Sequence, residues 1–425
     1  MLKNLTNINN EIRKIEEFIA SRTLIKDIIS PRKQLIDFLK PMDESLVILI
    51  KIEDIQYFSC FLDRESNEDI QEEFARKLFD LLPIECSFSK IYILEDGEFA
   101  IAKDKSDLLY KTEEMIKRIK NFQKRVNAEK INIGYIDYDI SIIISLAYGD
   151  DAFWDAKVGL RKIVDTKQNF ILANGKYRKN QEKSKKNIET FKMIQRAIDS
   201  CNIVSYFQPI VNNKTKNIDK HESLVRLIDD KNNIVSPYYF LEVSKKGKYY
   251  SQITFIVLEN SFKALRQTDT SISINFSALD IEKIETREKF LTLIKKNRVD
   301  AHRVTLELVE DENISDFSLI KEFINEIKSL GVKVAIDDFG VGYSNFERVL
   351  DYKPDFLKID GRLIKNLSTD KFAYSMVQAI VSFAKKENLQ TIAEFVESED
   401  IYNIICEMGV DYSQGYYFGK PDILI

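Results

Sequence analysis

Short apolar runs recur in the second half of the chain, and most of them stop at an acidic or amide residue. The residues at these stops are Asn275, Glu307, Asp337, Asp338, Asp360 and Glu394, and Glu222 opens a further run. Short apolar runs are typical of buried parallel strands, and barrel enzymes carry their functional residues at the carboxyl ends of such strands. Carboxylates gathered at one barrel mouth would repel one another unless cations neutralised them. The pattern therefore predicts a barrel enzyme with a divalent-metal site.

Strand and helix patterns alternate from residue 187 to the end of the chain. Phe191, Ile194 and Ile198 have helical spacing and mark the first helix. The strands are predicted at 203–210, 219–227, 270–276, 303–309, 332–337, 355–359, 390–394 and 409–417. About 240 residues of repeated βα units match the size of a barrel. We therefore predict an α/β fold with a (β/α)8 TIM-type barrel over residues 187–425.

The first half of the chain mixes strand and helix patterns in a different order. Strands are predicted at 46–52, 90–94, 99–103 and 140–146, and helices at 70–82 and 155–165. The Asp96-Gly97 pair between two alternating runs is a strong signal for a β-hairpin. Residues 25–173 are therefore expected to form a compact α+β domain with one sheet.

Two further segments flank this first domain. Apolar residues at helical spacing predict an N-terminal helix within residues 1–24, which would pack either on its own domain or on a dimer partner. Residues 174–186 are polar and rich in lysine, without an apolar stripe. We expect this second segment to be the interdomain linker.

Composition narrows the class of protein. The length of 425 residues favours two domains, and 44% hydrophobic with 31% charged residues is typical of a soluble protein. A net charge of -5 without a long basic segment argues against a nucleic acid polymer as partner. Four scattered cysteines and two histidines argue against disulfides, a histidine-rich metal site and a Ser-His-Asp triad. No apolar run approaches the roughly 20 residues that cross a bilayer, and no signal peptide begins the chain, so we expect a cytoplasmic protein without membrane contact.

Five motifs in the second domain resemble those of the EAL-domain phosphodiesterases. The motifs occupy residues 222–226, 337–344, 358–360, 393–397 and 414–421, and segments 207–211 and 275–278 fit the remaining motifs in order. The match covers nearly all of residues 187–425. The resemblance implies an enzyme that hydrolyses the bacterial second messenger cyclic di-GMP to linear pGpG with two Mg2+ or Mn2+ ions. It also implies a homodimer.

The resemblance assigns roles to individual residues. The metal ligands would be Glu222, Asn275, Glu307, Asp337, Asp338, Asp360 and Glu394, with Asp337 bridging the two ions. The catalytic residues would be Lys358, Glu394 and Gln414. The substrate contacts would be Gln208, Arg226 and Lys358, and Glu310 would anchor the loop after Asp338.

Several positions depart from the family pattern, although none of them removes a metal ligand. Valine replaces the usual threonine at 309 and 341, which is expected to weaken the anchoring of the loop. Phe395 stands where the family usually has glycine, and Lys245-Lys246 replaces an acidic stretch near the barrel entrance. A non-catalytic cyclic di-GMP receptor is the alternative function, and a scaffold that binds no nucleotide is a third. Receptors of this family typically lose several metal ligands, so the residues kept here favour the enzyme.

The first domain resembles a GGDEF domain, the fold that synthesises cyclic di-GMP, over residues 25–173. Segments 46–54 and 95–100 carry the resemblance, and segments 29–35 and 147–157 fit its outer landmarks. The two glycines of the family signature align with Glu95 and Asp96, whose side chains and charge would obstruct a triphosphate. Lys51 stands where a metal-binding aspartate is expected, with Glu53 in the second metal position. The resemblance therefore implies a degenerate domain with a structural, dimerising or allosteric role.

Overall fold

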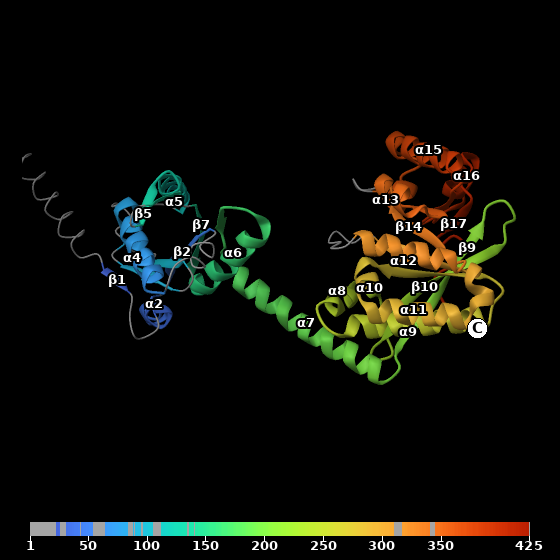
Figure 1. The fold of residues 1–425 in the computed structure, drawn as a ribbon, viewed down its shortest axis with the longest axis horizontal. Helices are drawn as coiled ribbons and strands as arrows, with labels where there is room; N and C mark the ends of the chain where they lie inside the picture. Colours follow the sequence, from blue (N-terminus) through green and yellow to red (C-terminus); the bar gives the residue numbers. More distant parts are fainter. Residues whose placement is uncertain are drawn as a thin grey trace, which may run out of the picture. The chain divides into compact units, whose positions relative to one another are not determined.

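The computed structural model forms two compact units, Met1–Lys186 and Asn187–Ile425 (Figure 1). The structure describes residues 23–25, 31–42, 44–53, 64–83, 88, 90–94, 97–104, 112–133, 136–139, 141–309, 317–340 and 345–424. Of the segment 1–24, in which an N-terminal helix is predicted, the structure describes only Thr23 and Leu24. These two residues begin strand β1 (Thr23–Ile25). Among the described helices, none is long and apolar enough to cross a membrane.

The first unit is built on a six-stranded sheet. Its strand order is β1, β3 (Lys90–Ile93), β4 (Glu98–Asp104), β2 (Ser45–Ile52), β7 (Ile142–Gly149) and β8 (Phe170–Leu172). Strands β3 and β4 pair antiparallel, which confirms the predicted hairpin. A separate small hairpin joins β5 (Lys130–Ile133) to β6 (Ile136–Asp139).

Helices cover both faces of this sheet. They are α2 (Pro31–Leu39), α4 (Arg64–Leu81), α5 (Thr112–Val126) and α6 (Ala152–Thr166). Alternate residues of a strand point to opposite faces, and in β2 both sets are buried. Ile48 and Ile50 pack in one cluster with residues of α4 and α5, while Val47 and Leu49 pack in another with residues of α2 and α6. The central strand is apolar from Leu46 to Ile50 because both of its faces are covered there.

The chain passes from the first unit to the second within one helix, α7 (Lys176–Asp199). The segment predicted as a polar linker is therefore helical from Lys176 onward. Its start is tied to α6, because the buried Asp155 accepts hydrogen bonds from the backbone nitrogens of Gly175 (2.7 Å) and Tyr177 (2.6 Å). The buried side chains of α7, Thr190, Ile194 and Ala197, all belong to its part in the second unit.

The second unit is a closed barrel, as predicted. The ring runs through β9 (Ile203–Asn212), β10 (Ile218–Ile228), β12 (Ser271–Ser277), β13 (Val304–Val309), β14 (Lys333–Phe339), β15 (Phe356–Ile359), β16 (Gln390–Ala393) and β17 (Tyr412–Gln414), and β9 pairs with both β10 and β17. The short strand β11 (Ile234–Val235) extends the sheet beside β10.

One strand departs from the predicted regular βα repeat. Strand β9 runs antiparallel to both of its neighbours, whereas the other strands of the ring pair in parallel. Residues 213–217 connect β9 to β10, and such a short connection allows a hairpin but no crossover helix.

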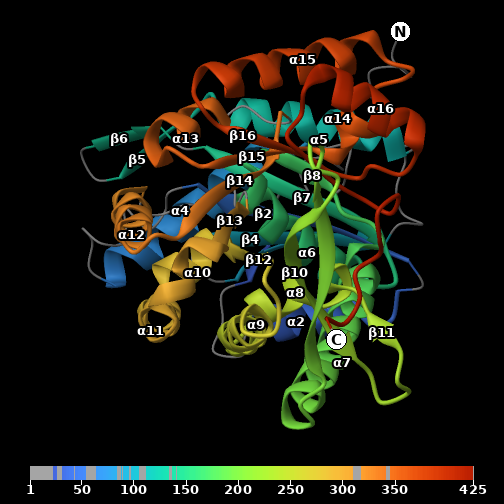
Figure 2. The same cartoon turned by 90° about the vertical axis from the view of Figure 1, so that its right-hand side faces the viewer.

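The longer helices of this unit form two groups on the outside of the barrel. One group contains α9 (Tyr249–Leu265), α11 (Ile284–Lys296) and α12 (Phe317–Ser329), and the other contains α13 (Asn345–Tyr352), α15 (Lys371–Lys386) and α16 (Glu399–Met408) (Figures 1 and 2). Each group has its own cluster of buried apolar residues against the strands. Short helices follow strand ends at α8 (Leu241–Lys245), α10 (Ala278–Glu282) and α14 (Gly361–Lys365), and 3-10 turns lie at Pro237–Tyr239 and Arg298–Arg303.

The inside of the barrel changes from apolar to polar along the strands. A small interior cluster consists of Ile210, Ala335, Phe356, Ile392 and Tyr412. Because side chains on one face of a strand recur every second residue, the next inward residues toward the mouth are Asp337, Lys358, Glu394 and Gln414. Strand β9 runs the other way, so its inward residue nearer the mouth is Gln208, which precedes Ile210. The strand period therefore places the polar residues in one layer.

Candidate active site at the barrel mouth

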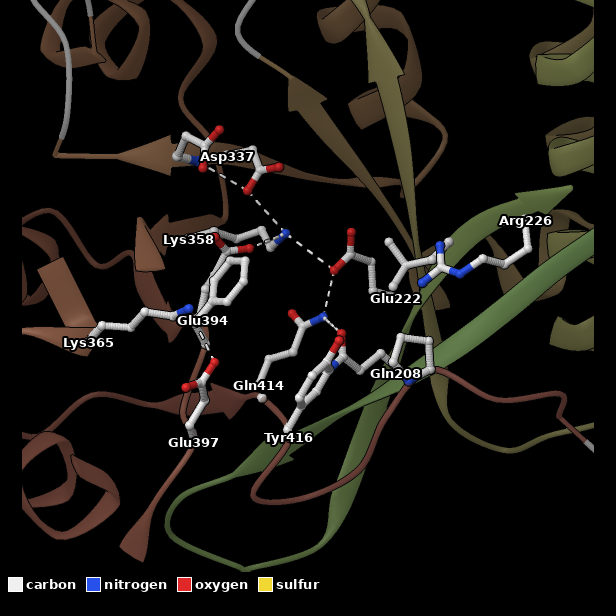
Figure 3. Close-up of a pocket in the computed structure, with 15 residues that line it drawn as sticks. Gln208, Glu222, Arg226, Asp337, Lys358, Lys365, Glu394, Glu397, Gln414 and Tyr416 are labelled. Atoms are coloured by element: carbon white, nitrogen blue, oxygen red, sulfur yellow. Dashed lines mark hydrogen bonds and ion pairs between the residues drawn. The ribbon is translucent and has the colours of Figure 1, made fainter. Parts of the chain in front are cut away.

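The ammonium of Lys358 lies at the centre of the polar layer. Its Nζ atom is 2.7 Å from Glu307 Oε2. It is also 2.8 Å from Glu394 Oε1, 3.1 Å from Asp337 Oδ1 and 3.5 Å from Glu222 Oε2 (Figure 3). Lys358 is only 1% exposed. Burial alone would lower the pKa of Lys358, but the surrounding carboxylates raise it well above its usual value. The lysine is therefore a buried cation that partly neutralises four acidic groups.

Two amide side chains orient Glu222. Asn275 Nδ2 donates a 2.7 Å hydrogen bond to Oε1, and Gln414 Nε2 donates a 2.6 Å hydrogen bond to Oε2. Burial tends to raise the pKa of Glu222, but Lys358 and these two donors outweigh it and leave the pKa below its usual value. Gln414 Nε2 also donates to Gln208 Oε1 at 3.2 Å, which links β17 to β9. These contacts hold an ionised carboxylate with both oxygens fixed.

Glu307 has a very different environment. It is fully buried, and neither oxygen accepts a hydrogen bond with good geometry from a described residue, although the Lys358 ammonium is close to one of them. Burial raises the pKa of Glu307 to about 8, with Glu222 and Asp337 adding to the shift and Lys358 opposing it. Burial also raises the pKa of Glu394 well above its usual value. A buried acid without donors normally marks a site for a missing cation or proton.

The end of β14 brings two successive acids to the mouth. The register of β14 against β15 shifts between Ile336 and Phe339, and Asp338 has a positive φ of 51°. One oxygen from each of Asp337, Asp338 and Glu394 lies within 4.8 Å of the other two. Burial raises the pKa of Asp338, and the charges of Asp337 and Asp360 add to this. This strained turn therefore adds the Asp338 carboxylate to Asp337 and Glu394, two of the acids that surround Lys358.

The donor set fits Mg2+ or Mn2+. All the candidate ligands offer hard oxygen atoms, which these ions prefer. The two Glu307 oxygens and Gln414 Oε1 are buried without a hydrogen-bond donor among the described residues. Divalent cations would satisfy such atoms and would reduce the repulsion among the acids.

Two predicted site residues stand apart from this geometry. The Asp360 carboxylate caps helix α14 by accepting from Arg362 N at 2.7 Å, and the Arg362 guanidinium binds the same carboxylate. The sequence predicted that Asp360 is a metal ligand. In the structure its carboxylate is instead paired with the guanidinium of Arg362, two residues further along the chain. Glu310, the predicted loop anchor, lies outside the described residues.

A cavity of about 470 Å³, lined mostly by charged and polar residues, opens over the carboxylates. Its lining includes the predicted residues Gln208, Glu222, Arg226, Asp337, Asp338, Lys358, Glu394 and Gln414. It also includes residues that the sequence did not single out as part of the site, namely Lys365, Glu397 and Tyr416 (Figure 3). Lys365 and Glu397 form an ion pair at 3.2 Å. Tyr416 is 61% exposed and lines this cavity.

Phe395 contributes a ring to the same cavity. It follows Glu394 and has a positive φ of 51°, a conformation that glycine adopts most easily. Its ring lies against Gly361, where a Cβ atom would collide with it, and the Lys365 ammonium lies 4.7 Å from the ring centroid. The sequence departure at this position therefore places an aromatic ring beside the carboxylates.

A second cavity of about 260 Å³ adjoins the acids from the side of α8 and α9. It is mainly apolar, and Leu224 and Asp337 line both cavities. His221, which precedes Glu222, lines neither of them and pairs through Nδ1 with Thr270 Oγ1 at 2.9 Å. The barrel mouth thus has two cavities, which share Leu224 and Asp337.

Comparison with known proteins identifies relatives of the barrel. The cyclic di-GMP phosphodiesterase PdeF of Escherichia coli (strain K12) is 27% identical over 250 residues, which cover 58% of this chain and 33% of PdeF. The cyclic di-GMP phosphodiesterase PdeA of Borreliella burgdorferi is 29% identical over 241 residues, covering 55% of this chain and 35% of PdeA. The matched segment therefore spans about a third of the length of these curated relatives.

A solved structure and a family model also match the barrel. The PaMucR phosphodiesterase in complex with c-di-GMP has a TM-score of 0.52 and 25% identity, over 55% of this chain and 97% of that one. The model of the EAL domain matches residues 192–421. Because this match covers more than half of the 425 residues, the chain belongs to the EAL-domain family.

Proposed function

We propose that the barrel hydrolyses cyclic di-GMP to linear pGpG with two divalent cations. The observation that carries this proposal is the group of four carboxylates around the buried Lys358, three of them buried and that of Asp337 partly buried, under a cavity lined by Arg226. The relatives named as cyclic di-GMP phosphodiesterases support the same substrate. The cationic Arg226 and Lys358 suit a phosphodiester anion.

A first Mg2+ or Mn2+ would be held by Glu222, Asn275, Glu307 and Asp337. A second would be held by Asp337, Asp338 and Glu394, and also by Asp360 if its carboxylate exchanged Arg362 for the metal ion. When bound, such ions neutralise phosphoryl oxygens and lower the pKa of water.

The residues of the chain have separate tasks in the reaction. Arg226 would orient a phosphate through its guanidinium group, since that group matches two phosphate oxygens. Asn275 and Gln414 keep Glu222 ionised and oriented. Hydrolysis adds the oxygen of water to phosphorus, breaks the bond to the 3′ oxygen and returns a proton to that leaving oxygen. Lys358 would stabilise the negative charge that grows on the phosphoryl group.

A turnover assay tests this function. The purified protein is incubated with cyclic di-GMP and Mg2+ or Mn2+, and pGpG is quantified beside the variant Glu222→Ala. The matched control is Glu259→Ala, an exposed acid on α9 that pairs with Lys289. We expect Glu222→Ala to lose at least about 100-fold in rate, because loss of metal binding costs several kcal/mol, and Glu259→Ala to keep full rate. Tight binding of cyclic di-GMP without turnover would instead identify a non-catalytic receptor.

For the first unit we propose a degenerate GGDEF-like domain without cyclase activity. Lys51 on β2 lies 3.6 Å from Oε1 of Glu98 on β4, and Lys157 of α6 pairs with the other oxygen of Glu98. Two ammonium groups therefore surround the acid that follows the hairpin turn, where a cyclase would need a metal ion. Incubation with GTP and Mg2+ should yield no cyclic di-GMP, and its formation would contradict this proposal. The expected homodimer is tested by the molar mass from light scattering.

A further inference from the structure

The two cavities at the barrel mouth differ in chemistry and meet at the carboxylates. The larger cavity is lined by charged residues such as Arg226, Lys365 and Glu397. The smaller one is lined mainly by apolar residues such as Leu241, Ile253 and Phe276. Both reach Leu224 and Asp337. A ligand whose phosphodiester lies at Asp337 can therefore extend one part into each cavity.

Most polar groups that line the smaller cavity are engaged within the protein. The buried Asp280 accepts hydrogen bonds from Tyr250 Oη, Thr254 Oγ1 and Ser277 Oγ, each at 2.8 Å, and from Ser277 N at 2.9 Å. Ser223 Oγ accepts from Ser261 Oγ at 2.7 Å. These groups hold α9 and α10 against the strands. Because these side chains already hydrogen-bond to one another, they are poorly placed to form hydrogen bonds with a ligand.

Lys245 is the cation among the residues that line the smaller cavity. It ends the short helix α8, and its Nζ atom lies 3.0 Å from Oε1 of Glu242. The Glu242 side chain is 77% exposed, whereas that of Lys245 is 23% exposed. Exposed ion pairs contribute little, about 0–1 kcal/mol. An acceptor on a ligand can therefore displace Glu242 from this pair at little cost.

We propose that Lys245 is a specificity-determining residue that selects guanine over adenine for the smaller cavity. This inference rests on the proposed function and assigns one base of the cyclic dinucleotide to this cavity. Guanine presents two acceptors, O6 and N7, along one edge, whereas adenine presents a donor amino group beside N7. An ammonium donates to both acceptors of guanine but meets a second donor on adenine. The apolar walls around Leu241 and Phe276 accommodate the faces of a planar base.

The test uses 3′,3′-cyclic GMP–AMP, a substrate with two different bases. Hydrolysis adds water across one of its two P–O3′ bonds, so the product is either pGpA or pApG. Which bond breaks depends on which base occupies the smaller cavity. The ratio of the two products therefore reports the choice of base. Because both products form in one reaction, the ratio does not depend on the fraction of the enzyme that is folded.

Three variants make the test specific. Lys245→Met removes the ammonium and keeps an unbranched side chain, and Lys245→Arg keeps the charge. Lys246→Met is the matched control, because Lys246 is the exposed next residue and does not line the cavity. One good pair between a side chain and a base edge discriminates by roughly tenfold. We therefore expect Lys245→Met to change the product ratio about tenfold, and Lys245→Arg and Lys246→Met to change it little.

Each outcome has a distinct meaning. An unchanged ratio in an active Lys245→Met enzyme would overturn the role of Lys245 while leaving the proposed phosphodiesterase function intact. An equal change in Lys246→Met would overturn it as well, because a general effect of charge would then explain the ratio. A wild-type protein that hydrolyses neither cyclic di-GMP nor cyclic GMP–AMP would instead overturn the proposed function and this inference with it.

Discussion

The Lys358 ammonium lies 2.7 Å from Oε2 of Glu307, and both side chains are almost completely buried. A buried acid and a buried base at this distance depend on each other, because either group alone would be an uncompensated charge in a low-dielectric interior. Three more carboxylates share the same ammonium. The polar layer therefore has excess negative charge.

The first prediction concerns the removal of this cation. Lys358→Met should lower the free energy of unfolding at pH 8 by about 3–5 kcal/mol in EDTA, the usual cost of breaking a buried ion pair. Added Mg2+ should restore part of the loss, because a bound cation replaces the missing positive charge. Urea denaturation with EDTA and with Mg2+ measures both values.

The control for this prediction is Lys365→Met, which breaks the more exposed pair with Glu397. Surface pairs contribute about 0–1 kcal/mol, so this variant should lose little stability in either buffer. An equal loss for Lys358→Met with and without Mg2+ would show that the carboxylates do not take up the ion.

The second prediction concerns the contact between Phe395 and Gly361. Gly361→Ala should destabilise the protein, because the new Cβ atom would collide with the Phe395 ring. In a Phe395→Gly background the same change should be far less harmful, with a coupling of about 1–3 kcal/mol between the two sites. Urea denaturation of the two single variants and the double variant gives this coupling.

Gly415→Ala provides the contrast for this cycle. Its Cβ atom would meet the backbone of Val396, so removing the Phe395 ring should not relieve it. Additive effects of Gly361→Ala and Phe395→Gly would show that the ring does not occupy the position described.

The third prediction concerns Lys220, which lies inside the barrel two residues before Glu222. Its Nζ atom has no hydrogen-bond partner among the described residues and lies 3.1 Å from the centroid of the Phe356 ring. Burial lowers the pKa of Lys220 from 10.5 to about 7, and the nearby Lys333 adds to this shift. Between these two pH values the unfolded chain binds more protons than the folded protein, so the contribution of Lys220 to stability improves as pH rises.

Lys220→Met should therefore be more stable than the wild type near pH 7, and this advantage should shrink toward pH 10. The slope of the difference should approach about 1.4 kcal/mol per pH unit, the value for one proton. Chemical denaturation at several pH values measures it, with the exposed Lys231→Met as control. A difference that does not vary with pH would mean that Lys220 keeps its ordinary pKa.

The sequence predicted the barrel well because its strands are short, apolar and regularly spaced. Asn275, Glu307 and Glu394 were identifiable because each ends or nearly ends such a run, and the strand period then brings them into one layer. The antiparallel direction of β9 was missed, although the five-residue connection to β10 was visible as a polar turn. Gln208 enters the same layer only because of that reversed direction.

Other site features depend on contacts that residue types do not reveal. Lys365 and Glu397 look like ordinary surface charges in the sequence, and only the fold places them at the larger cavity. For Asp360 a local signal existed, because Arg362 two residues later can pair with an acid at a helix start. The role proposed for Lys245 depends on the shape of the smaller cavity, which residues of β10, β12, α8 and α9 help to line.

The measurement that tests the central claim most directly is hydrolysis of cyclic di-GMP in water enriched in oxygen-18, with Mg2+ and followed by mass spectrometry. If the barrel directs water onto phosphorus, each pGpG molecule carries one oxygen-18 atom in its 5′-phosphate, and Glu222→Ala forms almost no labelled product. Absence of pGpG from the wild type, or equal labelled product from Glu222→Ala, would contradict the assignment of the carboxylate layer as a phosphodiesterase site.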